Sequence, residues 1–534
     1  MGFPAVLACG VAIRGTFLRV PVPRIETLET LPLVDHHCHG LVRRDLDRAA
    51  FERVMTEADE AGQPGASFFD SQLGFALRRY CAPVLDLPAH APPDDYLTRR
   101  AELGADEVAR RMLRAAGIAD FCVDTGFAPE RLTGSADLAE AVGGRGHDVV
   151  RLEPLAEQIA LDIVTGQVGV AHFPDQVRAR LAARAANTGQ GAPVVGVKSV
   201  AAYRVGLELP AERPSDRVVI AAVRSWIGRL RAGASIRLAD PVLHSFLIWT
   251  AADLTLPLQI HTGYGDTDLH LARANPLLLT DLLRALAPTG APVLLLHCYP
   301  FHREAGYLAQ VFPDVYLDVG LATHNVGRSA AAVLAEALEL APFGKLLFST
   351  DAFALAELYL LGARLFRRAL GAFLGTGVAD GDWTAQDADR VAAMVGAGNA
   401  RRVYGIAEPA VVATGPGSRA GAAGAGKPRV PRSTAKRATA RSVAEPAKRE
   451  RTAAKPAGSK PARSKPAGSK PTTPKAAPGK PATRRPATRE PSTREPSTSE
   501  PGTREPSARE ASAREAATKP GAVRRSAKPP PGSG

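Results

Sequence analysis

Six side chains that can bind a metal ion or transfer a proton follow short apolar runs of the sequence. They are His37, His39, Lys198, His261, His297 and Asp351. His37 and His39 are two residues apart, and residues at this spacing point to the same side of an extended strand. Both imidazoles can therefore reach one cation. Imidazole and carboxylate ligands suit Zn²⁺, which we expect here as one or two ions, and also Mn²⁺ or Fe²⁺.

The apolar runs themselves predict the elements that position these side chains. The predicted strands are 33–38, 120–123, 148–152, 194–197, 256–260, 293–296, 315–319 and 345–349. Their almost continuous apolar character is typical of strands buried on both faces of a parallel sheet. Amphipathic patterns between them predict helices, among them 216–232, 276–287, 328–340 and 354–370. Eight alternating strands and helices predict an α/β fold, a (β/α)8 TIM barrel, whose active site lies at the carboxyl ends of the strands.

The predicted domain organisation has three parts. Residues 1–30 form an N-terminal extension, 31–408 the barrel and 409–534 a tail. The barrel segment is longer than the ~250 residues typical of this fold, so it must contain insertions. The largest is 41–116, which is charged and mostly helical in pattern and is expected to cover the barrel mouth. The last predicted helix, 389–404, ends the folded region.

The tail differs sharply from the rest in composition. From Val411 onward there is no Phe, Tyr, Trp, Leu, Ile, Met or Cys, and 28 Lys and Arg stand against 8 Asp and Glu, a net charge of +20. The residues before Val411 include 39 Lys and Arg and 46 Asp and Glu, a net charge of −7, so the excess of positive charge belongs to the tail. A segment without aromatic residues, Leu, Ile or Met cannot bury a core, and we expect it to be disordered. It is either a solvated arm or a loose binder of polyanions such as nucleic acid, polyphosphate or acidic lipid.

The cysteines and the hydropathy restrict the cellular setting. Five cysteines are scattered and never spaced as C-x-x-C, which argues against a disulfide framework and favours a reducing cytoplasm. No uncharged apolar run reaches the ~18 residues of a membrane helix. We expect a cytoplasmic protein that acts on a small molecule, and the sequence also allows a homo-oligomer.

Further polar residues close or follow the predicted strands and are candidates for substrate binding. Tyr203 and Arg204 could hold a carboxylate; a packed Tyr and a surface Arg are the alternatives. Asp124 and Glu153 could receive a substrate amine or orient a ligand imidazole. His324 follows the seventh strand, and residues 265–268 are predicted to form a loop over the mouth.

The ordered set of strand-end residues resembles the amidohydrolase superfamily. H-x-H, Lys, His, His and Asp stand on strands one, four, five, six and eight. Five phrases are similar to one branch, the amidohydrolase-related domain that is fused to a glutamine-synthetase-like domain in fungal and plant proteins. They are VDHHCHG (34–40), FCVDTGF (121–127), KSVAAYR (198–204), HTGYGD (261–266) and NARRVYG (399–405). The resemblance covers about 33–405, and a basic tail follows here instead of a synthetase domain.

The resemblance implies roles for the six residues. Asp351 would be both a metal ligand and the general base, and would then deliver the proton to the leaving nitrogen. In many superfamily members the lysine is carboxylated and bridges two metals, so that His37, His39 and Asp351 would hold one ion and His261 and His297 the second. Otherwise one metal would be bound by His37, His39, His261 and Asp351. His297 would then donate a proton or polarise the substrate, and Lys198 would pair with an anionic substrate.

The expected function is metal-dependent hydrolysis of an amide or other C–N bond in a small anionic substrate. One alternative keeps the barrel and the metal but makes the enzyme a decarboxylase that breaks a C–C bond. The other is a barrel without catalysis whose tail binds polyanions. The complete set of six residues favours an enzyme over the last alternative.

Overall fold

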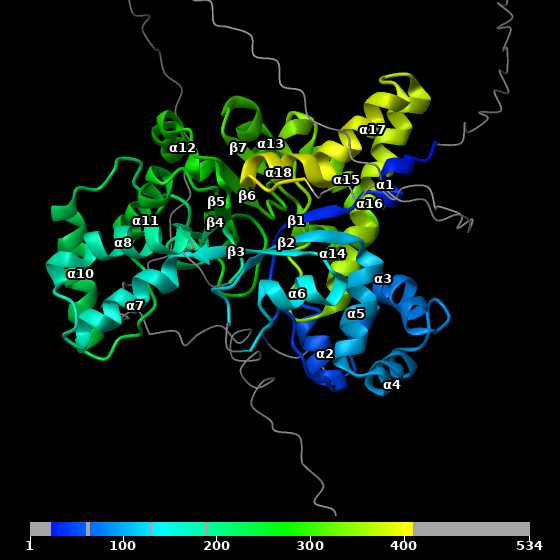
Figure 1. The fold of residues 1–534 in the computed structure, drawn as a ribbon, viewed down its shortest axis with the longest axis horizontal. Helices are drawn as coiled ribbons and strands as arrows, with labels where there is room; N and C mark the ends of the chain where they lie inside the picture. Colours follow the sequence, from blue (N-terminus) through cyan, green and yellow to red (C-terminus); the bar gives the residue numbers. More distant parts are fainter. Residues whose placement is uncertain (1–22, 60–64, 129–130, 187–190, 409–534) are drawn as a thin grey trace, which may run out of the picture. The chain divides into compact units, whose positions relative to one another are not determined.

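The computed structural model describes residues 23–59, 65–128, 131–186 and 191–408. At its centre is one parallel sheet of seven strands in the order β1 to β7, with helices around it (Figure 1). The strands are β1 Leu33–Cys38, β2 Ile118–Asp124, β3 Arg145–Arg151, β4 Val194–Ser199, β5 Leu258–His261, β6 Val293–Leu296 and β7 Val315–Leu317. Each lies within a few residues of its predicted range.

The predicted eighth strand, 345–349, differs from the expectation. These residues are all described and none is in a regular strand; a short 3-10 helix occupies Phe343–Lys345. The segment nevertheless lies between the two edge strands. The Leu347 amide donates to the Leu317 carbonyl of β7, and the His36 amide of β1 donates to the Phe348 carbonyl. The sheet thus curls until its edges share one segment, which fits an α/β barrel with seven regular strands and an irregular eighth.

Helices connect the strands and cover their outer side. The α-helices are α1 Glu26–Thr30, α2 Arg48–Val54, α3 Gln72–Tyr80, α4 Pro93–Leu103, α5 Ala105–Ala116, α6 Ser135–Val142, α7 Leu152–Val164, α8 Phe173–Ala186, α9 Ala201–Arg204, α10 Asp216–Arg231, α11 Pro241–Asp253, α12 Thr280–Leu286, α13 His302–Val311, α14 Gly320–Asn325, α15 Ala330–Ala337, α16 Ala356–Asp380, α17 Ala385–Ala393 and α18 Asn399–Tyr404. The predicted helix 216–232 is confirmed as α10. The predicted helix 389–404 is divided, because a π-helical turn at Met394–Gly398 separates α17 from α18.

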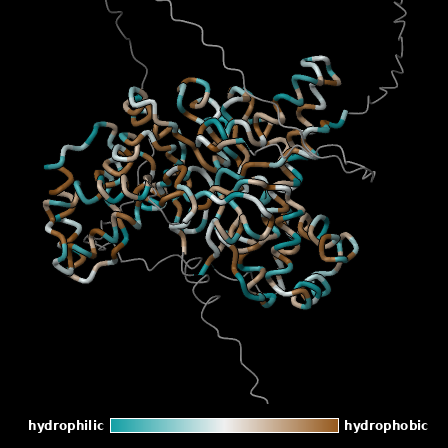
Figure 2. The backbone as a smooth tube through the Cα atoms, in the orientation of Figure 1, coloured by the Kyte–Doolittle hydropathy of each residue, from teal (hydrophilic) through white to brown (hydrophobic). Residues whose placement is uncertain are grey.

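Many of the helices contain both apolar and polar residues, as the backbone colouring shows (Figure 2). In α5, for example, the buried residues are Val108, Met112, Leu113 and Ala116, which form one stripe of the helix. This spacing is typical of a helix that packs one face on a core. Among the described residues, no helix is both long and apolar enough to cross a membrane.

The strands bury two sets of side chains. Leu33, Phe121 and Leu295 belong to the large core between the sheet and the helices. Val34, Cys122 and their neighbours on the opposite side form a smaller cluster inside the barrel. That inner cluster also contains Ala400 and Tyr404, so α18 packs against the barrel interior.

The insertion after β1 is helical, as predicted, and contains α2 to α5. It is anchored to α16 by a buried ion pair, because Arg100 Nε lies 2.8 Å from Glu357 Oε1. Tyr96 donates its hydroxyl to the same oxygen at 3.0 Å. Most of the predicted N-terminal extension and the whole predicted tail (409–534) lie outside the described residues, so the three-part division stays a prediction.

Candidate metal centre

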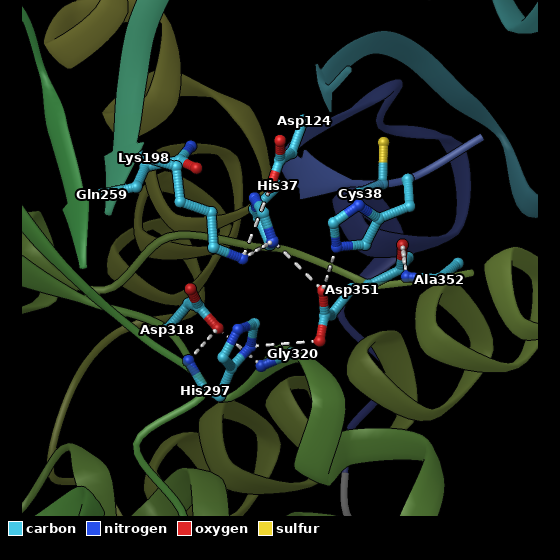
Figure 3. Close-up of polar contacts among 12 residues, drawn as sticks. His37, Cys38, Asp124, Lys198, Gln259, His297, Asp318, Gly320, Asp351 and Ala352 are labelled. Atoms are coloured by element: carbon cyan, nitrogen blue, oxygen red, sulfur yellow. Dashed lines mark hydrogen bonds and ion pairs between the residues drawn. The ribbon is translucent and has the colours of Figure 1, made fainter. Parts of the chain in front are cut away.

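The six candidate residues meet at the carboxyl ends of the strands. Figure 3 labels His37, Lys198, His297 and Asp351 among them. His37 is in β1 and His39 directly follows it, Lys198 is in β4, and His261 ends β5. His297 follows β6, and Asp351 follows the irregular eighth segment. Five of the six are buried and Asp351 is slightly exposed. The barrel therefore brings together side chains that are up to 314 residues apart in the chain.

Three imidazoles surround the Asp351 carboxylate. Asp351 Oδ1 lies 3.1 Å from His37 Nε2 and 3.4 Å from His39 Nε2. Its other oxygen lies 3.3 Å from His297 Nδ1. One ligand atom each from His37, His39 and Asp351 falls within 4.8 Å of the others, a spacing that one metal ion can span.

His261 lies beside this group. Its ring centroid is 4.5 Å from that of His297 and 4.5 Å from that of Tyr203. Within the described part of the chain, His261 Nε2 has no hydrogen-bond partner although it is buried. A buried polar atom without a partner is costly, and a bound ligand would remove this cost.

Lys198 reaches into the centre from β4. Its Nζ lies 2.9 Å from His37 Nε2 and 3.9 Å from Asp124 Oδ2. Burial lowers the pKa of Lys198, against the opposing effect of the Asp124 and Asp351 charges. An ammonium group in this position would repel a cation held by His37, so Lys198 fits a metal site either as a neutral amine or after modification.

Burial keeps the imidazoles in the neutral form that binds metals. It lowers the pKa of His37 to about 3, with the Lys198 charge adding to the effect, and that of His297 to about 4. The pKa of His261 is also well below its usual value, first because of burial and then because of His297. Burial opposes ionisation of Asp351, but the charge of His297 and hydrogen bonds from the two β1 histidines outweigh it and lower its pKa well below the usual range. At neutral pH the centre therefore offers the neutral imidazoles of His37, His261 and His297 and the Asp351 carboxylate.

The backbone is strained where it presents two of these residues. His297, Cys298 and Asp351 have φ values of +68°, +56° and +48°, the left-handed region that non-glycine residues rarely adopt. Strain of this kind costs about 1–3 kcal/mol per residue and clusters at functional sites. It turns His297 and Asp351 out of their strands and toward each other.

Asp35 holds the segment before Asp351, a role that the sequence did not indicate. Its two oxygens accept hydrogen bonds from the Thr350 amide, at 2.9 Å, and the Thr350 hydroxyl, at 2.5 Å. Burial raises the pKa of Asp35 to about 8. Asp35 precedes His37 by two residues, so β1 supplies both the metal-ligand candidates and the support of the opposite ligand.

The residues predicted to bind substrate fall into two groups. Tyr203 and Arg204 line the pocket beside the centre. Asp124 lies behind it and binds Arg151 through two hydrogen bonds, at 2.6 and 3.0 Å. Glu153 is in the first turn of α7, where it accepts hydrogen bonds from Ser199 and Val200 and lies 3.3 Å from His244. His324 is buried in α14 and, within the described chain, is not among the lining residues.

The pocket leads from His39, Lys198, His261, His297 and Asp351 to the surface. It encloses about 690 Å³ of space, part of it open to solvent. Its lining also includes Glu57, Phe127, Arg151, Val200, Arg237, Asp266, Asp268, Leu321 and Phe353. Glu57 comes from the insertion, and the neighbouring Asp59 accepts a hydrogen bond from Thr267 in the loop after β5. The insertion thus contributes to the mouth, as predicted.

Arg151 lines the pocket but is not among the residues predicted from the sequence. It is the last residue of β3, and its guanidinium stacks on Phe127 with 5.2 Å between Cζ and the ring centroid. The predicted strand ended one residue later, so Glu153 was assigned the place at the strand end that Arg151 occupies.

Comparison with known proteins agrees with this geometry. Residues 34–406 match a family model described as amidohydrolase. Protein fluG of Emericella nidulans is 29% identical over 413 residues, which are 71% of this chain and 46% of that protein, so the chain spans about half the length of this relative.

Solved structures show the same relationship. A crystal structure of a proposed metal-dependent hydrolase from Lactobacillus casei ATCC 334 is 29% identical, with a TM-score of 0.58, and the match covers 71% of this chain and 96% of that one. A uronate isomerase from Bacillus halodurans C-125 is 15% identical, with a TM-score of 0.47 over 71% and 95% of the two chains, a likeness too low to bear on the reaction. The family model matches well over half of the sequence and includes all six residues of the centre, and this chain therefore belongs to the amidohydrolase family.

Proposed function

We propose that this protein is a metal-dependent hydrolase of an amide or other C–N bond in a small anionic molecule. The observation that carries the proposal is the Asp351 carboxylate, which faces imidazoles of low pKa rather than a permanent cation. Its negative charge is thus left for a bound metal ion. Family membership and the similarity to the Lactobacillus casei protein support the same reaction class.

The proposed metal ligands are His37, His39 and Asp351, with His261 beside them. We expect Zn²⁺ as the resident ion, and Mn²⁺ or Fe²⁺ could take its place. A second ion would require His297 and a carboxylated Lys198 as ligands. Such a cation supplies a water molecule of lowered pKa and polarises the bond to be broken.

The chain's own residues would move the proton. Asp351 is ionised at neutral pH and can take a proton from water at its Oδ atoms, then deliver it to the leaving nitrogen. His297 Nδ1 lies 3.3 Å from the other Asp351 oxygen, which holds the carboxylate in place while its ring lines the pocket. Lys198 would stabilise the negative charge that develops on the substrate oxygen.

Recognition of an anionic group would fall to the basic residues of the lining. Arg151 is the strongest candidate, because Asp124 and the Phe127 ring fix its guanidinium from two sides. An oriented guanidinium binds a carboxylate with two hydrogen bonds. Tyr203 and Arg204 would make further contacts on the β4 side of the pocket.

The test begins with the full chain purified without chelators. Metal analysis should find one or two ions per chain, and a screen of N-acyl and γ-glutamyl compounds should find one that releases an amine or ammonia. Removal of the metal should abolish this release and Zn²⁺ or Mn²⁺ should restore it. Asp253→Asn, on an exposed ion pair with Arg213, is the matched control for Asp351→Asn. Release of CO2 without amine from the same compounds would replace the hydrolase with a decarboxylase.

A further inference from the structure

A chain of buried polar groups runs through the barrel interior from α18 to the metal centre. The Tyr404 hydroxyl oxygen lies 3.0 Å from His36 Nδ1, and His36 Nε2 lies 3.1 Å from Asp318 Oδ2. The other Asp318 oxygen accepts the backbone amides of His297, at 3.1 Å, and Gly320, at 2.7 Å (Figure 3). The side chains of His36 and Asp318 are fully buried and Tyr404 is nearly so.

The proton positions along this series of polar groups follow from the hydrogen bond to the His36 carbonyl. The His36 carbonyl can only accept a hydrogen bond, so the group that faces it at 2.8 Å is the amide nitrogen of Gln259. The same nitrogen donates its second hydrogen to the Tyr404 oxygen at 2.8 Å. Among the described residues, His36 Nδ1 is the only acceptor within hydrogen-bond distance of the Tyr404 hydroxyl, so Tyr404 turns its own hydrogen toward that nitrogen.

The next step fixes the tautomer of His36. With Nδ1 accepting from Tyr404, the ring carries its hydrogen on Nε2, which faces the Asp318 carboxylate. The opposite tautomer would leave the Tyr404 hydrogen without an acceptor and would turn a bare nitrogen toward a carboxylate. Burial raises the pKa of Tyr404 well above its usual value, so it remains a donor at neutral pH.

Asp318 connects His36 to the strained turn after β6. Its hydrogen bonds to the amides of His297 and Gly320 fix the carboxylate against the backbone at the point where φ of His297 is +68°. That conformation directs the His297 imidazole toward Asp351. If Asp318 rotates or loses its partner, the imidazole of His297 shifts relative to the reacting groups, and displacements of this kind are costly in catalysis.

We propose that Tyr404 is a positioning residue for the metal centre: its hydroxyl fixes the tautomer of His36, which holds Asp318 against the backbone of His297. The expected effect of Tyr404 on turnover rests on the proposed function. The expected effect of Tyr404 on the tautomer of His36 is independent of that function.

The test compares Tyr404→Phe with Tyr316→Phe in the full chain. Tyr316 belongs to the same inner cluster and is equally buried, but its hydroxyl contacts Arg402 and lies outside the chain of groups. Each variant loses one oxygen atom. We expect Tyr404→Phe to lower kcat about tenfold with KM unchanged, as expected for the loss of one buried hydrogen bond that acts through the transition state, and Tyr316→Phe to lower it by less than about twofold.

A second measurement needs no substrate. In protein labelled with ¹⁵N in the histidine rings, the signals of His36, identified by their loss in His36→Gln, should show a bare Nδ1 and a protonated Nε2. Tyr404→Phe should change these two nitrogen signals and Tyr316→Phe should not. The histidine spectra of these two variants can still be compared with that of the wild type if His36→Gln fails to fold. A protonated Nδ1 in the wild type, or identical histidine spectra in all three proteins, would overturn the proposal. If no substrate is hydrolysed at all, the proposed reaction fails while the spectra still decide the role of Tyr404.

Discussion

Two carboxylates, the slightly exposed Asp351 and the buried Glu357, lie six residues apart in the chain and have opposite surroundings. Glu357, in the first turn of α16, receives the Arg100 guanidinium and the Tyr96 hydroxyl on one oxygen. Asp351 lies beside the imidazoles of His37 and His297, whose pKa values of about 3 and 4 leave them neutral at neutral pH. Arginine is always charged, so the charge of Glu357 is neutralised within the chain. Asp351 has no guanidinium partner among the described residues; the nearby Lys198 is an amine whose pKa is lowered by burial. This difference separates a structural anchor from a site for a cation.

The largest expected effect is on activity in Asp351→Asn. The substitution keeps the shape of the side chain but removes the charge and the proton acceptor, so kcat/KM should fall by a factor of about 10³ or more. The melting temperature of the metal-free protein should change by less than about 2 °C, because no permanent cation loses its partner. Steady-state kinetics and calorimetry measure the two quantities. Retention of activity would show that Asp351 is not the base.

The second effect is on stability at the other carboxylate. Arg100→Met leaves Glu357 buried without its cation, which should cost about 3–5 kcal/mol in the free energy of unfolding. Arg100→Met combined with Glu357→Leu should cost less than the single change, since neither charge then remains. Urea denaturation of the three proteins measures this. Equal costs for the single and double variants would show that the ion pair does not anchor the insertion.

A smaller effect is expected where the pocket meets the substrate. Arg151→Gln should raise KM about 10- to 100-fold for an anionic substrate with a modest change in kcat, because binding that is equal in the ground and transition states is lost. Arg213→Gln, on the exposed pair with Asp253, is the control. An unchanged KM would move anion recognition to Arg204 or Lys198.

The smallest effect concerns acid stability of the metal-free protein. The unfolded chain protonates His37 and His297 near pH 6.5, whereas the folded chain does so only near pH 3 and 4. The unfolded state therefore binds more protons in this window, so stability should fall as the pH decreases from about 6.5 to 4. His297→Gln should make this fall less steep. Chemical denaturation at several pH values measures the slope, and a slope unchanged by the substitution would contradict the assignment.

The sequence predicts the site better than it predicts the surroundings of the site. His37, His39, His261 and His297 follow apolar runs closely, so a local pattern is enough to place them at one end of a sheet. The eighth strand was assigned from the same pattern, but its residues make too few regular hydrogen bonds with β1 and β7 to form a strand.

Partners across the barrel are not visible in a local pattern. Asp35 supports Thr350, and His36 pairs with Asp318, over separations of 315 and 282 residues. Which of two neighbouring residues faces inward depends on the pleat and on the residue where a strand ends. For this reason the sequence indicates neither the pairing of His36 with Asp318 nor the place of Arg151 at the end of β3.

The metal content of the full chain purified without chelators tests the central claim most directly. We predict one or two Zn²⁺, Mn²⁺ or Fe²⁺ ions per chain, lost in a His37→Ala, His39→Ala double variant and retained in Asp253→Asn. Protein that is free of metal as purified and binds neither Zn²⁺ nor Mn²⁺ on addition would contradict the account.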